Sequence, residues 1–471
     1  KVSILLVNII AKSQGGTDMA KMDFLSYPLP DILKKYIYQG FFKKAREQID
    51  KILEHRLPPQ MRERLKFELF RMELLKRTYR YTQEEAFKIF KKTFKNATKA
   101  EFEQLWKEGR LDWIYIETQR FFEIRFDKNL AFNEKEYKAR QRVDKQTLKR
   151  RELINKAVER LLKSGKPKSY RVRARITVEK ENPREEKVRV WLPFPKEEFQ
   201  QSDVKLISAS HECEIADNSV GQRTVYMEGK DNEKFYVEFE YTVHEWIGQQ
   251  SLYTQKPSKE DISELPPHIV FSPFLKELLH TIFHNEDWTT LDDLARARRI
   301  YDFVTLNVNY SYVLPYALYD NIPEYVATTF KGDCGFQALL FITLCRMAGI
   351  PAKWQSGWSI TPLVASPHDW ALVYLERYGW VPVDLSFGGA RREQEPMRIF
   401  YFTNIDGFRM FANTEFQGDF HPEKKAWRLD PYDNQIGEME IISKEEDGYV
   451  IDLKSEIEVV KFEELTMGKR K

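Results

Sequence analysis

The sequence predicts an α+β multidomain protein, with an N-terminal all-α region, then an antiparallel β-sandwich, then an α+β core. The 471 residues are about three times the length of a typical domain of roughly 150 residues. Residues 31–165 contain few turn residues, which is typical of long helices. At Ser169 the apolar pattern changes to the two-residue period of strands. The segment 266–430 combines both patterns, which indicates an α+β core.

The composition excludes several classes of protein. With 42% hydrophobic and 14% aromatic residues, the chain can bury a large core and differs from a disordered protein. The formal net charge is only +3, so no overall field indicates nucleic acid as a partner. Three cysteines, Cys213, Cys334 and Cys345, are too few for a disulfide framework, and no Cys and His pairs stand at the short spacing of a structural zinc site.

The segment 1–30 has no clear assignment. Its longest uncharged apolar run, Val2 to Ala11, is about half of the roughly 20 residues that a transmembrane helix needs, so we expect no integral membrane segment. The run fits a signal-peptide core, an edge strand, or a segment upstream of a start at Met19 or Met22. The cytoplasm is slightly favoured as the location, and export would follow if residues 2–11 are a signal-peptide remnant.

We expect residues 31–165 to form a helical domain. Within 145–162, four apolar residues repeat at the spacing of one helical face: Ile154, Val158, Leu161 and Leu162. Residues 134–166 contain 12 Lys or Arg against 5 Asp or Glu. A solvated helix face explains this excess better than an acidic partner, because Tyr137 is the only aromatic residue there that could stack on a base.

Residues 166–250 predict a β-sandwich domain. Apolar residues alternate with polar ones from Tyr170 to Val178, from Val188 to Leu192, and again across 235–243. No nucleophile, base and acid gather in this segment, so we expect a scaffolding or substrate-presenting role. Residues 431–471 are expected to form a β-rich C-terminal extension.

The segment 266–430 carries the residues that indicate chemistry. Six residues follow one helical face: Phe336, Leu339, Leu340, Thr343, Leu344 and Met347. The predicted helix begins near Asp333 and ends at the Gly349 turn, so Cys334 lies at its N-terminus. Unpaired N–H groups and the helix dipole favour a thiolate there. We therefore expect a lowered pKa for Cys334 and alkylation of this thiol before Cys213 or Cys345, which we place in the core.

Three blocks of this segment resemble the transglutaminase-like superfamily. Residues 332–352 (GDCGFQALLFITLCRMAGIPA) resemble its nucleophile helix, 368–373 (HDWALV) its His-x-Trp strand, and 379–384 (GWVPVD) its Gly-Trp-x-x-x-Asp strand. The segment 307–310 (NVNY) is similar to the tyrosine-ended segment of bacterial members. The resemblance covers about 165 residues. It implies a papain-like or transglutaminase-like catalytic core, with Cys334, His368 and Asp384 as the catalytic residues.

The register of one hairpin tests this interpretation. If Leu375 paired with Trp380, His368 and Asp384 would lie on opposite sides of the sheet. With a three-residue loop, Leu375 pairs with Gly379 and His368 becomes a diagonal neighbour of Asp384, about 7 to 8 Å away. Catalysis requires the second register. Asp369 departs from the family, which usually has a small residue there; it adds a negative charge near the base unless it points to the opposite face.

The expected function is a cysteine-dependent hydrolase that acts on peptide or carboxamide bonds through a thioester. Cys334 is the nucleophile, His368 exchanges the proton, and Asp384 orients the imidazole. The Cys334 N–H is expected to stabilise the oxyanion, and Tyr310 is a second candidate donor for which a packing role is equally plausible.

Two alternatives stay open: a protein-glutamine transamidase that uses the same triad, and a catalytically idle interaction scaffold. We expect a protein, peptide or cell-wall peptide as substrate, and no cofactor. We expect no metal either, since no acidic cluster resembles the calcium sites of animal transglutaminases.

Overall fold

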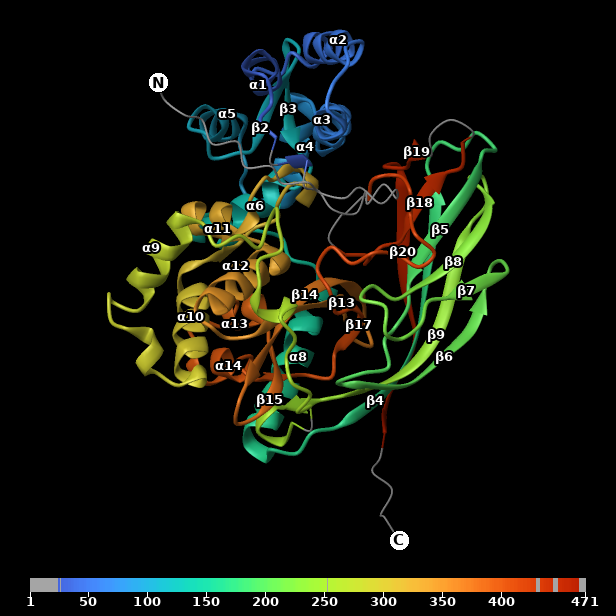
Figure 1. Ribbon diagram of the computed structural model, residues 1–471. Helices are drawn as coiled ribbons and strands as arrows, with labels where there is room; N and C mark the ends of the chain where they lie inside the picture. Colours follow the sequence, from blue (N-terminus) through green and yellow to red (C-terminus); the bar gives the residue numbers. More distant parts are fainter. Residues whose placement is uncertain (1–23, 26, 252, 429–432, 444–447, 466–471) are drawn as a thin grey trace, which may run out of the picture.

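The computed structural model describes residues 24–465 except 26, 252, 429–432 and 444–447. The apolar run that prompted the signal-peptide hypothesis lies outside these residues. Figure 1 shows helices at the top, in blue, two β-sheets at the right, in green and red, and a mixed helix and sheet region at the lower left, in yellow and orange. Mixed helix and strand content of this kind confirms the predicted α+β multidomain class.

The N-terminal region is mainly helical. Its helices are α1 (Asp31–Tyr38), α2 (Phe42–Leu53), α3 (Pro59–Thr78), α4 (Gln83–Thr93), α5 (Lys99–Lys107), α6 (Phe126–Asn133), α7 (Lys135–Arg140) and α8 (Lys145–Ser164). Thr82 and Thr98 start α4 and α5 with capping boxes. In α8 the expected face is buried except at Leu162, which is 46% exposed.

The structure adds a small antiparallel sheet that the helical expectation for this region did not include. It has the order β1-β3-β2 and consists of β1 (Tyr79–Tyr81), β2 (Trp113–Ile116) and β3 (Gln119–Glu123). Strands of three to five residues are too short to show a clear two-residue period in the sequence.

Two sheets form the sandwich. One has the order β20-β4-β9-β6 and the other β19-β18-β5-β8-β7. The strands from the middle of the chain are β4 (Ser169–Lys180), β5 (Lys187–Pro193), β6 (Gln201–Ala209), β7 (Cys213–Ile215), β8 (Thr224–Lys230) and β9 (Phe235–His244). Those from the C-terminal part are β18 (Glu438–Ile441), β19 (Gly448–Tyr449) and β20 (Leu453–Leu465).

The inward side chains of both sheets share one apolar core, to which β4 contributes Val172 and Ile176, and β5 contributes Val188 and Val190. The C-terminal strands therefore complete the sandwich instead of extending beyond it, because β20 pairs with β4 along almost its whole length.

The third region begins with short connecting elements: β10 (Trp246–Ile247) and the 3-10 turns η2 (Gly248–Gln250), η3 (Glu260–Ile262), η4 (Trp288–Thr290) and η5 (Tyr316–Leu318). Its helices are α9 (Pro273–Ile282), α10 (Asp293–Asn307), α11 (Ile322–Thr329), α12 (Cys334–Met347), α13 (Leu385–Gly389) and α14 (Glu395–Phe400). Its strands are β11 (Asn309–Tyr310), β12 (Lys331–Gly332), β13 (Ala352–Ile360), β14 (Ala365–Leu375), β15 (Gly379–Val383), β16 (Asn404–Ile405) and β17 (Arg409–Asn413).

Helix α12 is the centre of this region. It packs on β13 and β14, which belong to an antiparallel sheet of order β15-β14-β13-β17. Every side chain from Cys334 to Arg346 is buried. Cys345 is fully buried within this core, as expected.

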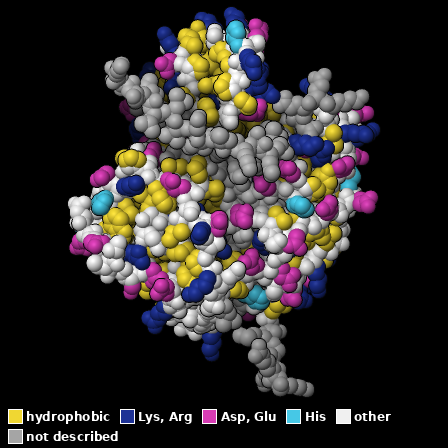
Figure 2. Space-filling view, viewed as in Figure 1, with side chains coloured by type: hydrophobic (Ala, Val, Ile, Leu, Met, Phe, Trp, Pro, Cys, Tyr) yellow, Lys and Arg dark blue, Asp and Glu magenta, His cyan; other side chains and the backbone are white. Residues whose placement is uncertain are grey.

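The helical N-terminal region contacts the mixed region through polar side chains. Arg71 of α3 donates to the Ala317 carbonyl at 2.7 Å and to Asp320 at 2.8 Å, and Asn129 of α6 donates to the Tyr312 carbonyl at 3.1 Å. None of the described helices has the length and apolar character that crossing a bilayer requires. On the face in Figure 2, basic and acidic side chains are interspersed, and apolar side chains gather over the helices at the top.

Candidate active site

Cys334 is the first residue of α12. Asp333 caps this helix, because its Oδ1 accepts from the Phe336 N–H at 3.0 Å and from the Tyr316 hydroxyl at 2.9 Å. The residue before the cap, Gly332, pairs with Tyr310 in a short parallel bridge. The predicted helix with Cys334 at its N-terminus is present.

The turn into α12 leaves no room for a side chain at Gly335. A Cβ there would lie 2.0 Å from the Tyr316 hydroxyl oxygen and 2.8 Å from Oδ2 of Asp369. The glycine after the cysteine therefore allows Tyr316 and Asp369 to approach the helix N-terminus.

His368 and Asp384 meet across the predicted hairpin. Leu375 pairs with Gly379, which is the three-residue loop that the sequence analysis required. The Nε2 of His368 lies 2.7 Å from Oδ2 of Asp384, and both side chains are buried. The expected juxtaposition of these two residues is confirmed.

Arg409, at the start of β17, supports this pair. Its guanidinium donates to Oδ2 of Asp384 at 2.9 Å and to Oδ1 of Asp406 at 3.0 Å. Burial by itself would raise the pKa of Asp384, but His368 and Arg409 together lower it to about 2. Asp384 is therefore a carboxylate at neutral pH, whereas burial lowers the pKa of His368 despite the attraction of Asp384.

The Cys334 thiol lies against Asp369. Its Sγ is 3.2 Å from Oδ2 of Asp369, and the thiol is 8% exposed. Burial, followed by the charges of Asp369 and Asp333, raises the pKa of Cys334 well above the usual value. The expected lowering of this pKa is thus wrong for this arrangement, because two carboxyl groups and desolvation outweigh the helix dipole.

The alternation of β14 explains why the two side chains separate. Consecutive residues of a strand point to opposite faces. Trp370 and Leu372 pack with Trp246 and Phe199 on one face of the sheet, whereas Ala371 packs with α12 on the other. His368 shares the first face and Asp369 the second. Within the described residues, no hydrogen bond joins Cys334 to His368.

Asp433 and Gln435, from the C-terminal part of the chain, complete the surroundings of Asp369. Gln435 donates to Oδ1 of Asp369 and, at 3.2 Å, to the carbonyl of His368. Asp433 is hydrogen-bonded to Asp369, and burial raises the pKa of both carboxyl groups; the charge of Asp433 raises the pKa of Asp369 further, whereas the hydrogen bond to Asp369 opposes the rise at Asp433. Neither residue stands in a recognisable motif, so no sequence signal could have found them.

Tyr310 lies close to the thiol. Its pKa is raised by burial and then by the charges of Cys334 and Asp333. Its ring packs edge-on against Phe132 of α6, with the centroids 5.1 Å apart. The position is compatible with the proposed role toward an oxyanion and equally with packing.

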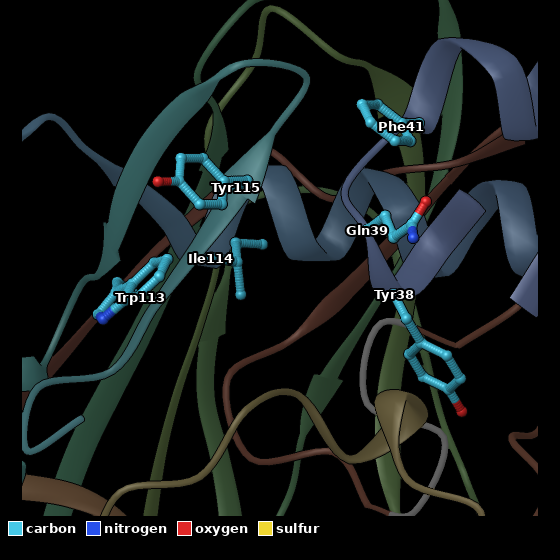
Figure 3. A pocket seen from close by; sticks show the side chains of 6 residues that line it. All are labelled: Tyr38, Gln39, Phe41, Trp113, Ile114 and Tyr115. Atoms are coloured by element: carbon cyan, nitrogen blue, oxygen red, sulfur yellow. The ribbon is translucent and has the colours of Figure 1, made fainter. Parts of the chain in front are cut away.

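The described residues contain no group of three or more His, Cys, Asp or Glu side chains that is arranged to hold a metal ion. A surface hollow of about 500 Å³ lies in the N-terminal region (Figure 3). It is lined by Tyr38, Gln39 and Phe41 from the end of α1 and the turn after it, and by Trp113, Ile114 and Tyr115 of β2. None of these residues belongs to the segment that contains Cys334, His368 and Asp384.

Comparisons with known proteins agree with this geometry. The family model of the transglutaminase-like superfamily matches residues 285–385, which include Cys334, His368 and Asp384. No curated protein matches the chain.

Among solved structures, a "putative cysteine protease" from Cytophaga hutchinsonii is 15% identical, with 63% of this chain and 92% of that chain covered and a TM-score of 0.40. The periplasmic domain of TgpA from Pseudomonas aeruginosa is 14% identical, with 50% of this chain and 98% of that domain covered and a TM-score of 0.27. The assignment rests on the family match and not on these distant likenesses. Residues 285–385 of this chain are therefore a domain of the transglutaminase-like superfamily.

Proposed function

We propose that this protein is a cysteine-dependent hydrolase that cleaves peptide or carboxamide bonds through a thioester intermediate. The family match supports a papain-like cysteine enzyme. The observation that carries the proposal is the buried hydrogen bond between His368 and Asp384, 2.7 Å long and supported by Arg409. A packing histidine does not need a carboxylate that is itself held by a second buried charge.

In this mechanism Asp384 fixes the imidazole through Nε2, which leaves Nδ1 for the thiol. The backbone N–H of Asp369 is close enough to Sγ to favour the thiolate, so the sulfur lies beside the peptide that joins His368 to Asp369. The mechanism requires Sγ to turn from the Asp369 carboxyl toward Nδ1. His368 then accepts the thiol proton and later donates it to the leaving amine or ammonia.

The free N–H groups at the start of α12 are the expected oxyanion donors, because the first turn of a helix has unpaired N–H groups. Of these N–H groups, the side chain of Asp333 accepts only from that of Phe336. Water releases the acyl group in the hydrolase, whereas an amine would release it in a transamidase.

The test is to incubate the full chain with a peptide library and a primary amine, and to read the masses of the products. We expect hydrolysis products from the wild type and from Cys213→Ser, a variant that removes a thiol outside the site, and none from Cys334→Ser or His368→Ala. Incorporation of the amine would identify a transamidase.

A second candidate is an idle scaffold, and the contact between Cys334 and Asp369 favours it, because a buried neutral thiol is a poor nucleophile. If the wild type and Cys334→Ser give identical products across the library, the scaffold replaces the hydrolase.

A further inference from the structure

Arg150 lies on α8, in the N-terminal region, yet its guanidinium reaches the sheet that carries His368. Its Nη2 donates to Oγ of Ser359 at 2.9 Å and to Oγ of Ser366 at 3.0 Å. These serines face each other across β13 and β14. Figure 1 shows α8 beside these strands.

The position of Ser366 places Arg150 next to the imidazole. Ser366 and His368 are two residues apart on β14, so their side chains project from the same face at a spacing of about 7 Å. The charge of Arg150 also contributes to lowering the pKa of His368.

Tyr310 links this corner to the nucleophile. The Tyr310 phenol interacts electrostatically with Cys334 and with Arg150. The phenol is thus near both the guanidinium and the thiol.

The guanidinium is incompletely partnered. Among the described residues no carboxylate forms an ion pair with it, and its hydrogen-bond acceptors are the hydroxyls of Ser359 and Ser366 and the Ser359 carbonyl. Its Nε is buried without an acceptor. The nearby carboxylates of Asp384 and Asp406 are both engaged by Arg409. A half-buried cation in this state is unusual, because buried charges are normally paired.

We propose that Arg150 is a substrate-binding residue that recognises a carboxylate on the leaving fragment of the substrate. The proposal rests on the proposed function for the direction of the substrate: the histidine protonates the leaving nitrogen, so the leaving fragment lies on the imidazole side of the scissile bond. A guanidinium forms charge-assisted hydrogen bonds with carboxylates, and here Nη1 has no acceptor among the described residues and remains for one. The carboxylate is either a free C-terminus or an acidic side chain.

The test uses the full chain with Cys334→Ala, which binds without turnover, so its outcome does not depend on whether the protein is a hydrolase. The probe is a set of short peptides in matched pairs, one series differing in a C-terminal acid or amide and the other in Glu or Gln. Equilibrium dialysis with mass spectrometry measures the retention of each member.

We expect the acid member of one series to be retained about tenfold more than its partner, and the series that shows the preference identifies the source of the carboxylate. Arg150→Met should abolish the preference. Arg151→Met, the exposed neighbour on the same helix, should keep it. Ser366→Ala should keep it as well, because the guanidinium remains while one of its tethers is lost.

Three outcomes overturn the proposal. The first is that both members of every pair are retained equally, or that no peptide is retained at all. The second is that Arg150→Met lowers acid and neutral members equally, which would make Arg150 a structural tether between α8 and the sheet. The third is that Ser366→Ala loses the preference for the acid member as Arg150→Met does, which would also make Arg150 a structural tether.

Discussion

At the scale of single residues, the choice between Asp369 and His368 as the neighbour of the thiol decides its chemistry. Next to a carboxyl group, the thiolate of Cys334 is disfavoured, whereas an imidazolium would stabilise it. The two possible neighbours are consecutive residues of β14, whose side chains project from opposite faces of the sheet.

Replacing Asp369 with Asn should make the thiol more reactive. The change replaces a carboxyl group at 3.2 Å from Sγ with an amide that cannot ionise, so no negative charge can form beside the thiolate, the pKa of Cys334 should fall and its alkylation should begin at lower pH. The rate of reaction with iodoacetamide, measured against pH in a Cys213→Ser background, gives this pKa directly. Asp217→Asn, on an exposed turn, is the control. An unchanged profile in Asp369→Asn would mean that burial alone raises the pKa of Cys334.

Replacing Arg409 with Met should destabilise the protein strongly. Arg409 is fully buried between Asp384 and Asp406, and the loss of one member of a buried charge cluster costs about 3 to 5 kcal/mol. Urea unfolding should show this loss at pH 7. Arg377→Met, in the exposed hairpin loop, should stay within about 0.5 kcal/mol of the wild type. A loss of the same small size for Arg409→Met would contradict the role assigned to this ion cluster.

Cys334, His368 and Asp384 could be identified from the sequence because each stands in a short motif with a defined spacing. Arg409, Asp433 and Gln435 could not, since nothing local distinguishes a buried arginine or glutamine from an exposed one. Their positions depend on the pairing of β17 with β13 and on a C-terminal segment that returns to the site. The direction of the pKa of Cys334 was also missed, because helix position is visible in the sequence and the packing of Asp369 is not.

At the scale of elements, the start of α12 combines a good cap with an unfavourable charge. Burial raises the pKa of Asp333 to about 6, although the Phe336 N–H and Tyr316 hydroxyl oppose this. Asn caps a helix as well as Asp does but cannot ionise.

Asp333→Asn should therefore change how stability depends on pH. The folded wild type binds the Asp333 proton more tightly than the unfolded chain does, so its stability relative to the variant should fall as pH rises from about 4 to about 6. Between these pH values, the free energy of unfolding of the wild type should fall by about 2 kcal/mol relative to that of Asp333→Asn. Urea unfolding across this range measures the difference. A difference that stays constant with pH would show that Asp333 is ionised throughout.

Gly335→Ala should disturb the same turn. The added methyl group would lie 2.0 Å from the Tyr316 hydroxyl oxygen, and forcing an extra carbon into a packed site typically costs about 1 to 3 kcal/mol. Gly389→Ala is the matched control, because its nearest neighbour would be 3.5 Å away. Thermal unfolding should separate the two variants, and equal melting temperatures would show that the turn adjusts freely.

The long strands and the hairpin could be predicted because their apolar residues alternate over enough positions to fix a face. The hairpin register followed from requiring His368 and Asp384 to lie on one side of the sheet. The sheet of β1, β2 and β3 was missed because each of its strands is short and lies between strongly helical segments.

At the scale of the whole molecule, the sandwich is assembled from two distant parts of the chain. Ile457 of β20 pairs with Ile176 of β4, and Met439 of β18 pairs with Val190 of β5. Such pairings are invisible to local periodicity, which shows that strands exist but not which strands meet.

A chain that stops after residue 428 should lose the cooperative unfolding of the complete protein. Its β4 and β5 would each lack a partner strand, and exposed edges promote association. Circular dichroism during heating and light scattering would report the two effects. A monomeric truncated chain that unfolds at the wild-type temperature would show that the C-terminal strands are dispensable.

The contact of the C-terminal segment with the site also has a consequence for the synthesis of the protein. The ribosome delivers the chain from its N-terminus, and Gln435, which bonds to the backbone of His368, emerges long after the helix and the hairpin. Until the strands that follow it have paired with β4 and β5, the nascent site lacks one of its walls. The site, and with it the proposed activity, would therefore be complete only after synthesis has passed the last strand.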